Sequence, residues 1–169
     1  PGFESENSAL ALKVKDGQRI VLLGNTLAER MQHHGWLETY AQLAMPEKKL
    51  TFRNIGWSGD TVFGHARSYF GPPQEGFGRL EKLVHEENPT LILANYGANA
   101  SFQGEAGLKD FLSGYGRLVD MLKKTGARTA ILPPLPQEKL PPPLPVPRPT
   151  PPSHAQECNK PLGQTPPSL

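Results

Sequence analysis

Short apolar runs recur along the chain at intervals that suit the strands of an α/β protein. Four of them have strand length, and they cover residues 19–23, 50–55, 90–95 and 127–132. The third run is apolar at almost every position, which is typical of a strand that is covered on both faces. We therefore expect four strands, separated by segments of 26 residues or more in each case.

Between these runs, apolar residues recur at helical spacing. The pattern is clearest from Leu108 to Leu122, and residues 123–126 (KKTG) close it with positive charge and a glycine. A second helix is expected from Pro73 to Glu87, because the following Asn-Pro pair disfavours helical backbone. A third is expected after Thr26, with a break at Gly35.

The alternation of strands and helices predicts the α/β class, as a three-layer α/β/α sandwich around a parallel sheet. Strand–helix–strand units form right-handed parallel crossovers, which place helices on the faces of the sheet. In such sheets ligands bind just beyond the carboxyl ends of the strands. The segments of interest are therefore residues 24–27, 56–61 and 97–101.

A change in composition marks the end of this pattern. Of 19 prolines, 14 lie between Pro133 and Pro167, and such a stretch continues neither a helix nor a central strand. We therefore expect an N-terminal extension at 1–17, a domain at 18–132, and a proline-rich, polyproline II or disordered tail at 133–169. The tail contains a Pro-x-x-Pro spacing of the kind that polyproline-recognising domains bind.

Charge and cysteine content exclude several classes of protein. The net charge is only +2 and basic residues are scattered, so no nucleic-acid partner is expected. No apolar run approaches the roughly 20 residues of a membrane span. The single Cys158 excludes an internal disulfide and a cysteine metal cluster.

Each of the three loops carries one group with candidate catalytic chemistry. The Thr26 hydroxyl could act as a nucleophile if a base removes its proton, or it could cap a helix through a Thr-x-x-Glu box with Glu29. The Gly59 amide could donate to an oxyanion, or the residue could form an ordinary turn. Asn99 offers a side-chain donor, but asparagine after a strand is also a common turn residue. Singly, none of the three decides between these interpretations.

Taken together and in this order, the three groups resemble the SGNH hydrolase family, which includes the GDSL esterases and lipases. Residues 24–27 (GNTL) lie where that family has Gly-Asp-Ser-Leu, as in divergent members with Asn-Thr there; residues 54–61 (NIGWSGDT) and 97–100 (GANA) resemble its second block and its Gly-x-Asn-Asp block. The resemblance spans residues 18–132 and implies a flavodoxin-like fold, hydrolysis of a carboxylic ester or an acetylated carbohydrate, and an extracytoplasmic or secreted location. It assigns Thr26 as nucleophile, and the Thr26 amide, the Gly59 amide and the Asn99 side chain as the oxyanion hole. No cofactor and no metal are expected.

The departures from the family pattern concern the chemistry. Threonine in place of serine adds a methyl group beside the attacking oxygen, and Asn25 and Ala100 stand where the blocks have aspartate. The family also places an Asp-x-x-His pair in its last segment, whereas the only histidine here after Asp120 is His154 in the tail. We therefore expect a fold that is incomplete at its C-terminus and a weak or inactive site, the tail being either native or the product of a truncation or frameshift.

Other histidines offer weak substitutes for the missing base. His65 is the best placed, because it follows the Gly59 loop, although an exposed loop histidine is the favoured interpretation. His33 and His34 are expected on the first helix, where adjacent side chains point about 100° apart, so they do not form a metal site.

Two other functions remain open. One is a non-catalytic carbohydrate-binding module of the same fold, in which Trp57, Tyr96 and Phe102 would stack on sugar rings, unless these are packing aromatics. The other is a nucleotide or flavin binder of the same topology, but neither a Gly-x-Gly-x-x-Gly motif nor a P-loop is present. The expected partner is thus a small-molecule or carbohydrate ester substrate.

Overall fold

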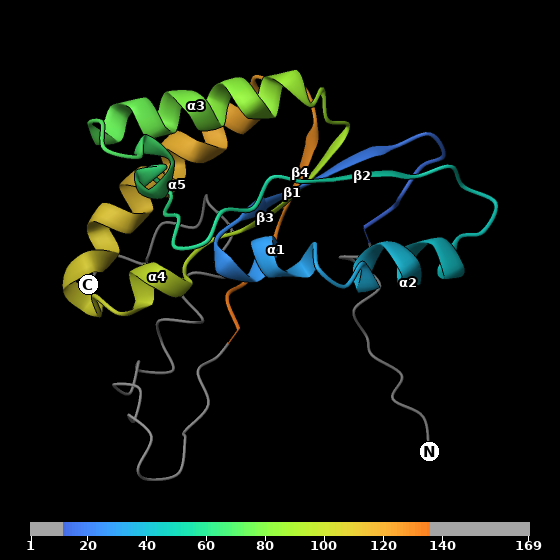
Figure 1. Cartoon of the computed structure of the whole chain (residues 1–169), viewed down its shortest axis with the longest axis horizontal. Coiled ribbons are helices and arrows are strands. Elements are labelled where there is room, and N and C mark those ends of the chain that lie inside the picture. The colour runs from blue at the N-terminus through green and yellow to red at the C-terminus, as the bar shows by residue number, and fades with distance from the viewer. Residues whose placement is uncertain (1–11, 136–169) are drawn as a thin grey trace, which may run out of the picture.

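The computed structural model of the protein describes residues 12–135 (Figure 1). Most of the expected extension and tail, with His154, Cys158 and the Pro-x-x-Pro spacing, lies outside the described residues. The elements follow one another as β1 (Arg19–Gly24), α1 (Thr26–Met31), α2 (Trp36–Ala44), β2 (Thr51–Asn54), η2 (His65–Ser68), α3 (Pro73–Glu86), β3 (Leu91–Asn95), α4 (Ala98–Ser101), η3 (Glu105–Gly107), α5 (Leu108–Lys123) and β4 (Arg128–Ile131).

The four strands form one parallel sheet in the order β2-β1-β3-β4. This is the order of the flavodoxin-like doubly wound sheets, whose strand sequence is 2-1-3-4-5. The chain moves outward from β1 in one direction to β2 and then in the other to β3 and β4, so the order reverses between β1 and β3. The predicted α/β class and parallel sheet are confirmed, and the reversal marks where such sheets bind ligands.

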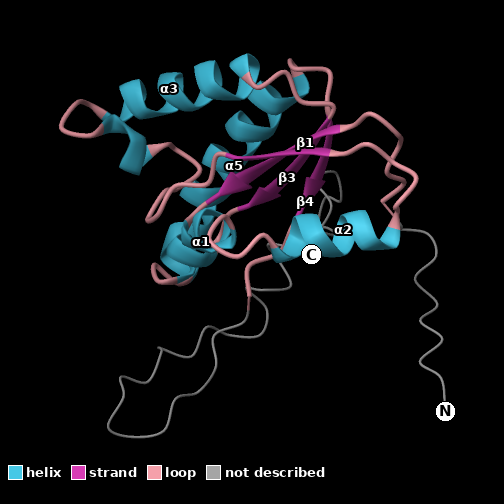
Figure 2. Ribbon diagram, turned by 45° about the vertical axis from the view of Figure 1, so that its right-hand side comes forward, coloured by secondary structure: helices cyan, strands magenta, loops and turns pink. Residues whose placement is uncertain are grey.

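Helices cover both faces of the sheet, which gives the three predicted layers (Figure 2). Helices α3 and α5 lie on one face, where they pack against Val21, Leu23 and Ile92. Helices α1 and α2 lie on the other face, where Ile20 and Leu22 point. Both side-chain orientations of β1 are thus buried, which explains why its sequence is continuously apolar.

The helix boundaries follow the predicted signals closely. Gly35, in the left-handed region at φ 61°, separates α1 from α2 as expected. Proline at the first position of α3 suits a helix start, and α3 ends before the Asn-Pro pair. One expectation is wrong: α1 ends at Met31, so His33 and His34 lie in the turn after it rather than on the helix. No helix within residues 12–135 is long and apolar enough to cross a membrane.

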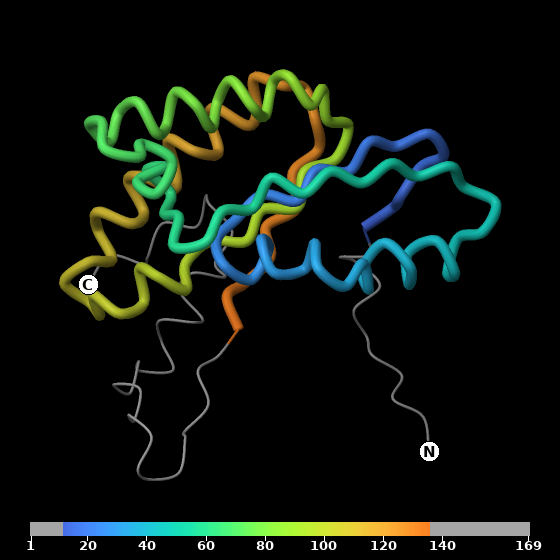
Figure 3. Tube along the Cα trace, in the orientation of Figure 1, coloured from blue at the N-terminus to red at the C-terminus, as the bar shows by residue number. Residues whose placement is uncertain are grey.

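A long irregular segment joins β2 to α3 and was not predicted in detail (Figure 3). It contains only the short η2, and it returns to α3 at a point of close backbone contact. A Cβ on Gly64 would lie 2.7 Å from the Phe77 amide nitrogen, and its φ is 72°, so only glycine fits there. This segment carries Gly59, and its course decides how the candidate site is built.

Candidate active site

The three predicted site residues meet at the carboxyl edge of the sheet. Thr26 follows β1, Gly59 follows β2, and Asn99 follows β3, on either side of the point where strand order reverses. Because parallel strands end at the same edge, residues from distant parts of the chain come together here. The structure brings all three into one hydrogen-bonded arrangement.

Thr26 is the first residue of α1 and is not its cap. Asn25 is the N-cap, and its Oδ1 accepts a hydrogen bond from the Leu27 amide at 3.4 Å. The alternative of a Thr-x-x-Glu capping box is therefore wrong, because Asn25 takes the role one residue earlier. The Thr26 hydroxyl is solvent-exposed and accepts a hydrogen bond from the Gly59 amide at 3.0 Å.

Glu29, the residue expected to complete that box, instead fastens the second loop to α1. Its carboxylate accepts hydrogen bonds from the Ser58 hydroxyl at 3.1 Å and from the Gln32 side chain at 3.0 Å. Partial desolvation acts to raise the pKa of Glu29, but these bonds and the charges of Arg30 and His33 outweigh it, so the pKa lies below its usual value. The Ser58 bond holds the loop that carries Gly59 beside Thr26.

Gly59 presents its amide through a left-handed backbone conformation. Its φ is 73°, which an L-residue with a Cβ rarely adopts, and its neighbour Trp57 donates its own amide to the Gly24 carbonyl at 3.0 Å. The loop is therefore fixed to the end of β1 at Trp57 and to the start of α1 at Gly59, on the two sides of Ser58. This is the conformation that aims the Gly59 amide at Thr26 Oγ1.

Asn99 joins the same loop from the other side. It lies in the short α4, is partly buried, and donates its Nδ2 to the Asp60 carbonyl at 3.1 Å. Its amide group is thus attached one residue beyond Gly59. The hydroxyl, the backbone amide and the side-chain amide that were expected together are linked through residues 59–60.

A buried ion pair, which the sequence did not predict, anchors this loop. Arg67 Nε lies 2.6 Å from Asp60 Oδ2, and a second Arg67 nitrogen donates to the Ile55 carbonyl at 2.7 Å. The Tyr96 hydroxyl donates to the same Asp60 oxygen at 3.2 Å. Burial, and next the Asp60 charge, raise the pKa of the Tyr96 phenol far above its usual range, so Tyr96 stays protonated. Tyr96 is therefore a buried packing residue. The alternative, that its ring stacks on a sugar, is wrong.

Asn25 and Asn95 complete the buried polar groups at this edge. The Asn25 amide donates to the Asn95 carbonyl at 3.3 Å, while the Asn25 side-chain nitrogen has no hydrogen-bond partner in the described part of the chain. The Asn95 side chain donates to the carbonyls of Leu132 and Pro133, at 3.4 Å and 3.1 Å. The chain that leaves β4 is thereby attached to the end of β3.

His65 is exposed and is bound to a neighbour rather than to Thr26. Its Nδ1 lies 3.0 Å from Thr61 Oγ1, and its ring stacks on Phe63 with centroids 5.3 Å apart. It lines a small cavity of about 70 Å³ together with Asn99 and Phe111. The favoured interpretation, an exposed loop histidine, agrees with this placement.

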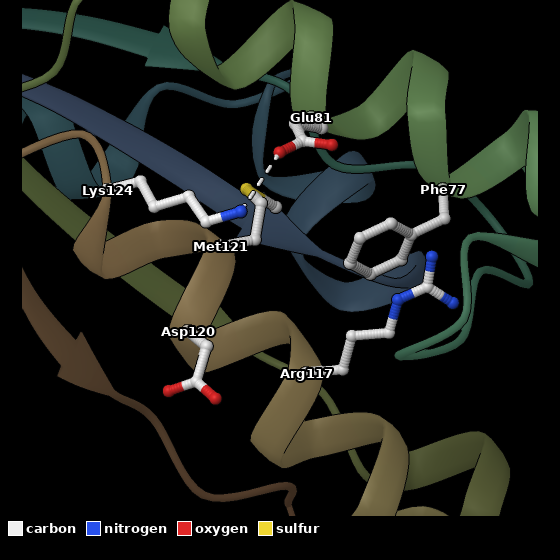
Figure 4. Close-up of a pocket in the computed structure, with 6 residues that line it drawn as sticks. All are labelled: Phe77, Glu81, Arg117, Asp120, Met121 and Lys124. Carbon is white, nitrogen blue, oxygen red and sulfur yellow. Dashed lines mark ion pairs between the residues drawn. The ribbon is translucent and has the colours of Figure 1, made fainter.

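A larger groove of about 470 Å³ lies between α3 and α5 (Figure 4). Phe77 and Met121 contribute its apolar part, the Arg117 guanidinium stacks 3.9 Å from the Phe77 ring, and Lys124 pairs with Glu81 at 3.9 Å. None of its lining residues belongs to the three loops of the site. Within residues 12–135, no group of three or more histidine, cysteine or acidic side chains is arranged to hold a metal ion.

Comparison with known proteins shows a similarity of fold. No family model and no curated protein matches this chain. Among solved structures, the acetylxylan esterase Axe2 from Geobacillus stearothermophilus superimposes with a TM-score of 0.58 at 16% identity, over 73% of this chain and 63% of that one. LAE5, an alpha/beta hydrolase from the metagenome of Lake Arreo in Spain, gives 0.55 at 16% identity, over 72% and 62%.

BT4096, a gut microbial diltiazem-metabolizing enzyme, gives a TM-score of 0.51 at 19% identity, over 75% of this chain and 29% of that one. Two of the matching Axe2 structures are catalytic mutants, in which an aspartate or the histidine three positions after it is replaced with alanine. The chain thus spans less than two thirds of the length of these structures. At this level of identity the likeness concerns architecture, and the chain has the α/β fold of the acetylxylan esterases and related hydrolases.

Proposed function

We propose that the edge of the sheet that carries Thr26, Gly59 and Asn99 is an ester-hydrolase site of the SGNH type, acting on a carboxylic ester or an acetylated carbohydrate. The observation that carries the proposal is the 3.0 Å hydrogen bond from the Gly59 amide to Thr26 Oγ1, with Asn99 attached to the next residue of the same loop. A hydroxyl is thereby placed beside one N–H donor, and a second donor is attached to the next residue of the loop; a nucleophile and N–H donors are the groups that acyl transfer requires. The esterase fold supports the same class of reaction.

In the proposed reaction, Thr26 Oγ1 attacks the ester carbonyl carbon and forms a C–O bond. The carbonyl electron pair moves to its oxygen, and the amides of Thr26 and Gly59 with the Asn99 side chain stabilise that oxyanion. A base takes the proton of the Thr26 hydroxyl and returns it to the departing alcohol as the intermediate collapses, which leaves an acyl group on Thr26. Water then attacks this acyl group and loses a proton to the base, and the carboxylic acid leaves as the Thr26 hydroxyl is restored. The Gly59 and Asn99 donors must exchange their present acceptors, Thr26 Oγ1 and the Asp60 carbonyl, for the oxyanion.

The proton of the Thr26 hydroxyl needs a base, and this chain offers a poor one. The only histidine after β4 is His154, and no aspartate follows Asp120. His65 is bound to Thr61. In Axe2, catalytic mutants replace an aspartate and a histidine three positions apart, the spacing that is missing here. We therefore expect the 169-residue chain by itself to be weak or inactive.

Chemical rescue tests this proposal. Hydrolysis of p-nitrophenyl acetate is measured for the unaltered chain and for Thr26→Ala, with and without added imidazole as an external base. The Thr26→Ala variant gives the background, since imidazole attacks this ester directly. We expect little turnover without imidazole, and a Thr26-dependent increment that grows with imidazole concentration, because the hydroxyl is exposed.

Two outcomes test separately whether Thr26 is the nucleophile and whether the chain lacks its own base. Equal rates for both proteins at every imidazole concentration, with both proteins folded, would show that Thr26 is not a nucleophile. Strong Thr26-dependent turnover without imidazole would show that the chain already holds its base and that the weak activity expected is wrong.

The alternative is a module of this fold that binds carbohydrate at the same edge without hydrolysis. Two of the three aromatics considered for stacking are exposed, namely Trp57 and Phe102, which favours this reading. Glycan-array binding that persists in Thr26→Ala, together with no Thr26-dependent hydrolysis under rescue, would support the alternative.

A further inference from the structure

Trp57, which was considered for sugar stacking, is joined by Tyr69 in an exposed aromatic group on the segment that carries Gly59. Trp57 is 37% exposed and Tyr69 is 65% exposed, their ring centroids are 5.9 Å apart, and their planes are nearly perpendicular at 83°. Phe70, the next residue, is fully exposed. Trp57 and Tyr69 thus form a corner of two ring surfaces, which we name the aromatic corner.

Two arginines fix the aromatic corner to the core. The Arg67 guanidinium lies 5.5 Å from the Trp57 ring centroid, and Arg67 is itself locked by Asp60. The Arg79 guanidinium lies 4.7 Å from the Tyr69 centroid and donates to the Arg67 carbonyl at 2.9 Å. The rings are therefore oriented in advance, and a ligand would not have to order them.

Tyr69 has an unfavourable backbone conformation. Its φ of 53° and ψ of −110° fall in a region that residues with a Cβ rarely occupy. Such a conformation is energetically unfavourable and persists where the surrounding structure imposes it. The chain thus keeps a large aromatic ring exposed, although glycine would suit this backbone better.

The backbone of Trp57 is close to the loop that carries Thr26. Trp57 is two residues before Gly59, so their Cα atoms are at most about 7 Å apart. The Trp57 amide is hydrogen-bonded to the Gly24 carbonyl, two residues before Thr26. The backbone of Trp57 therefore lies at the same edge of the sheet as Thr26, on the loop whose Gly59 amide binds Thr26 Oγ1.

We infer that the aromatic corner of Trp57 and Tyr69 is a subsite for a pyranose ring, which binds the sugar part of an acetylated saccharide next to Thr26. The C–H bonds on one face of a pyranose carry partial positive charge and suit the negative face of an aromatic ring. Two perpendicular rings contact both a face and an edge of the sugar, and the exposed Arg79 side chain supplies N–H donors for its hydroxyls. This inference deepens the proposed function and rests on it for the position of the ester.

Tryptophan fluorescence gives a direct test on the 169-residue chain, because its sequence contains only two tryptophans, Trp57 and Trp36. In a Trp36→Phe background, the emission of Trp57 is followed during titration with acetylated xylo-oligosaccharides, and calorimetry measures the same binding. We expect a saturable change in Trp57 emission.

Substitutions in the corner should weaken binding by about twofold to tenfold, since stacked aromatic contacts are worth about 0.5–1.5 kcal/mol beyond the area they bury. Tyr69→Gly is the sharper variant, because it removes the ring and relieves the backbone penalty, so the protein stays folded. Trp57→Ala is followed by calorimetry alone. Tyr40→Ala, an equally exposed aromatic on α2, is the matched control and should leave the affinity unchanged.

Each outcome decides the inference separately from the proposed function. No saccharide binding, or an affinity that Tyr69→Gly and Trp57→Ala leave unchanged, would overturn the aromatic corner as a sugar subsite. Binding of neutral lipid vesicles through the same rings, without saccharide binding, would also overturn it. Saccharide binding that depends on the corner while Thr26-dependent hydrolysis is absent under imidazole rescue would uphold the subsite and refute the hydrolase.

Discussion

Arg67 Nε lies 2.6 Å from Asp60 Oδ2, and the side chains of Arg67 and Asp60 are only 4% and 0% exposed. The pair connects the residue after Gly59 to η2, the short helix that precedes α3. Through the Asp60 carbonyl it also supports Asn99, and through the Arg67 guanidinium it supports Trp57. One buried contact therefore organises both the proposed oxyanion donors and the aromatic corner.

Replacing Arg67 with methionine should strongly destabilise the protein. The substitution leaves the Asp60 carboxylate buried without a counter-ion, while its Oδ1 already lacks a partner in the described part of the chain. Breaking such a pair costs about 3–5 kcal/mol in the free energy of unfolding, which urea denaturation measures.

Two further variants give the control and the contrary outcome for the pair. Arg53→Met removes an exposed arginine that lies 3.6 Å from Glu87, and it should cost less than about 1 kcal/mol. Asp60→Asn added to Arg67→Met should recover part of the loss, because it removes the buried charge. If Arg67→Met cost no more than Arg53→Met, the pair would not anchor the loop.

The raised pKa of Tyr96 predicts a loss of stability in alkaline solution. The folded protein keeps the phenol protonated at pH values where the unfolded chain, with a tyrosine pKa of about 10, releases the proton. The folded state then binds more protons than the unfolded state, so the free energy of unfolding falls as the pH rises above about 10.

Tyr96→Phe isolates this contribution, because lysines also titrate in the same range. The variant should lose about 1 kcal/mol near neutral pH through its missing bond to Asp60, yet decline less steeply above about pH 10. Urea denaturation at a series of pH values measures both slopes. Parallel slopes for the two proteins would mean that Tyr96 ionises as an ordinary tyrosine.

Gly56 should tolerate no side chain, because the loop approaches α1 closely there. A Cβ on Gly56 would lie 2.5 Å from the Glu29 amide nitrogen and 2.7 Å from the Ala28 carbonyl carbon, and backbone atoms cannot yield as a side chain can. Gly56→Ala should therefore cost about 1–3 kcal/mol, seen as a lower Tm. Gly78→Ala in α3 meets nothing within 4 Å and should raise the stability by about 0.5–1 kcal/mol. Equal effects of the two substitutions would contradict the close approach.

The sequence predicted the layers and the edge of the site, because these follow from local patterns. An apolar run such as β3 can be read from neighbouring residues alone, and the carboxyl ends of parallel strands coincide whatever the details of the connections. The sequence therefore places Thr26, Gly59 and Asn99 at one edge of the sheet, but it does not predict their contacts.

What could not be predicted depends on contacts across the irregular segment. The Asp60–Arg67 pair has no periodic signature, and the burial of Tyr96 follows from that pair rather than from the residues around it in sequence. Asn25 and Thr26 both have side chains that suit an N-cap, so the sequence alone leaves the first residue of α1 uncertain by one position. In the structure Asn25 is the N-cap. The exposed ring of Tyr69 has no sequence signal, because its backbone conformation is imposed by tertiary contacts.

The methyl group of Thr26 gives a last prediction about the nucleophile. Threonine restricts the side-chain rotation that turns the hydroxyl from Gly59 toward a substrate carbonyl, and an unfavourable rotamer costs about 0.5–1.5 kcal/mol. Thr26→Ser should therefore increase the imidazole-dependent hydrolysis of p-nitrophenyl acetate by about twofold to tenfold. Thr26→Val, which keeps the shape and removes the hydroxyl, should abolish the same increment. A serine variant no faster than the unaltered chain would mean that rotation of the hydroxyl does not limit attack, and an increment that survives in the valine variant would rule out residue 26 as the nucleophile.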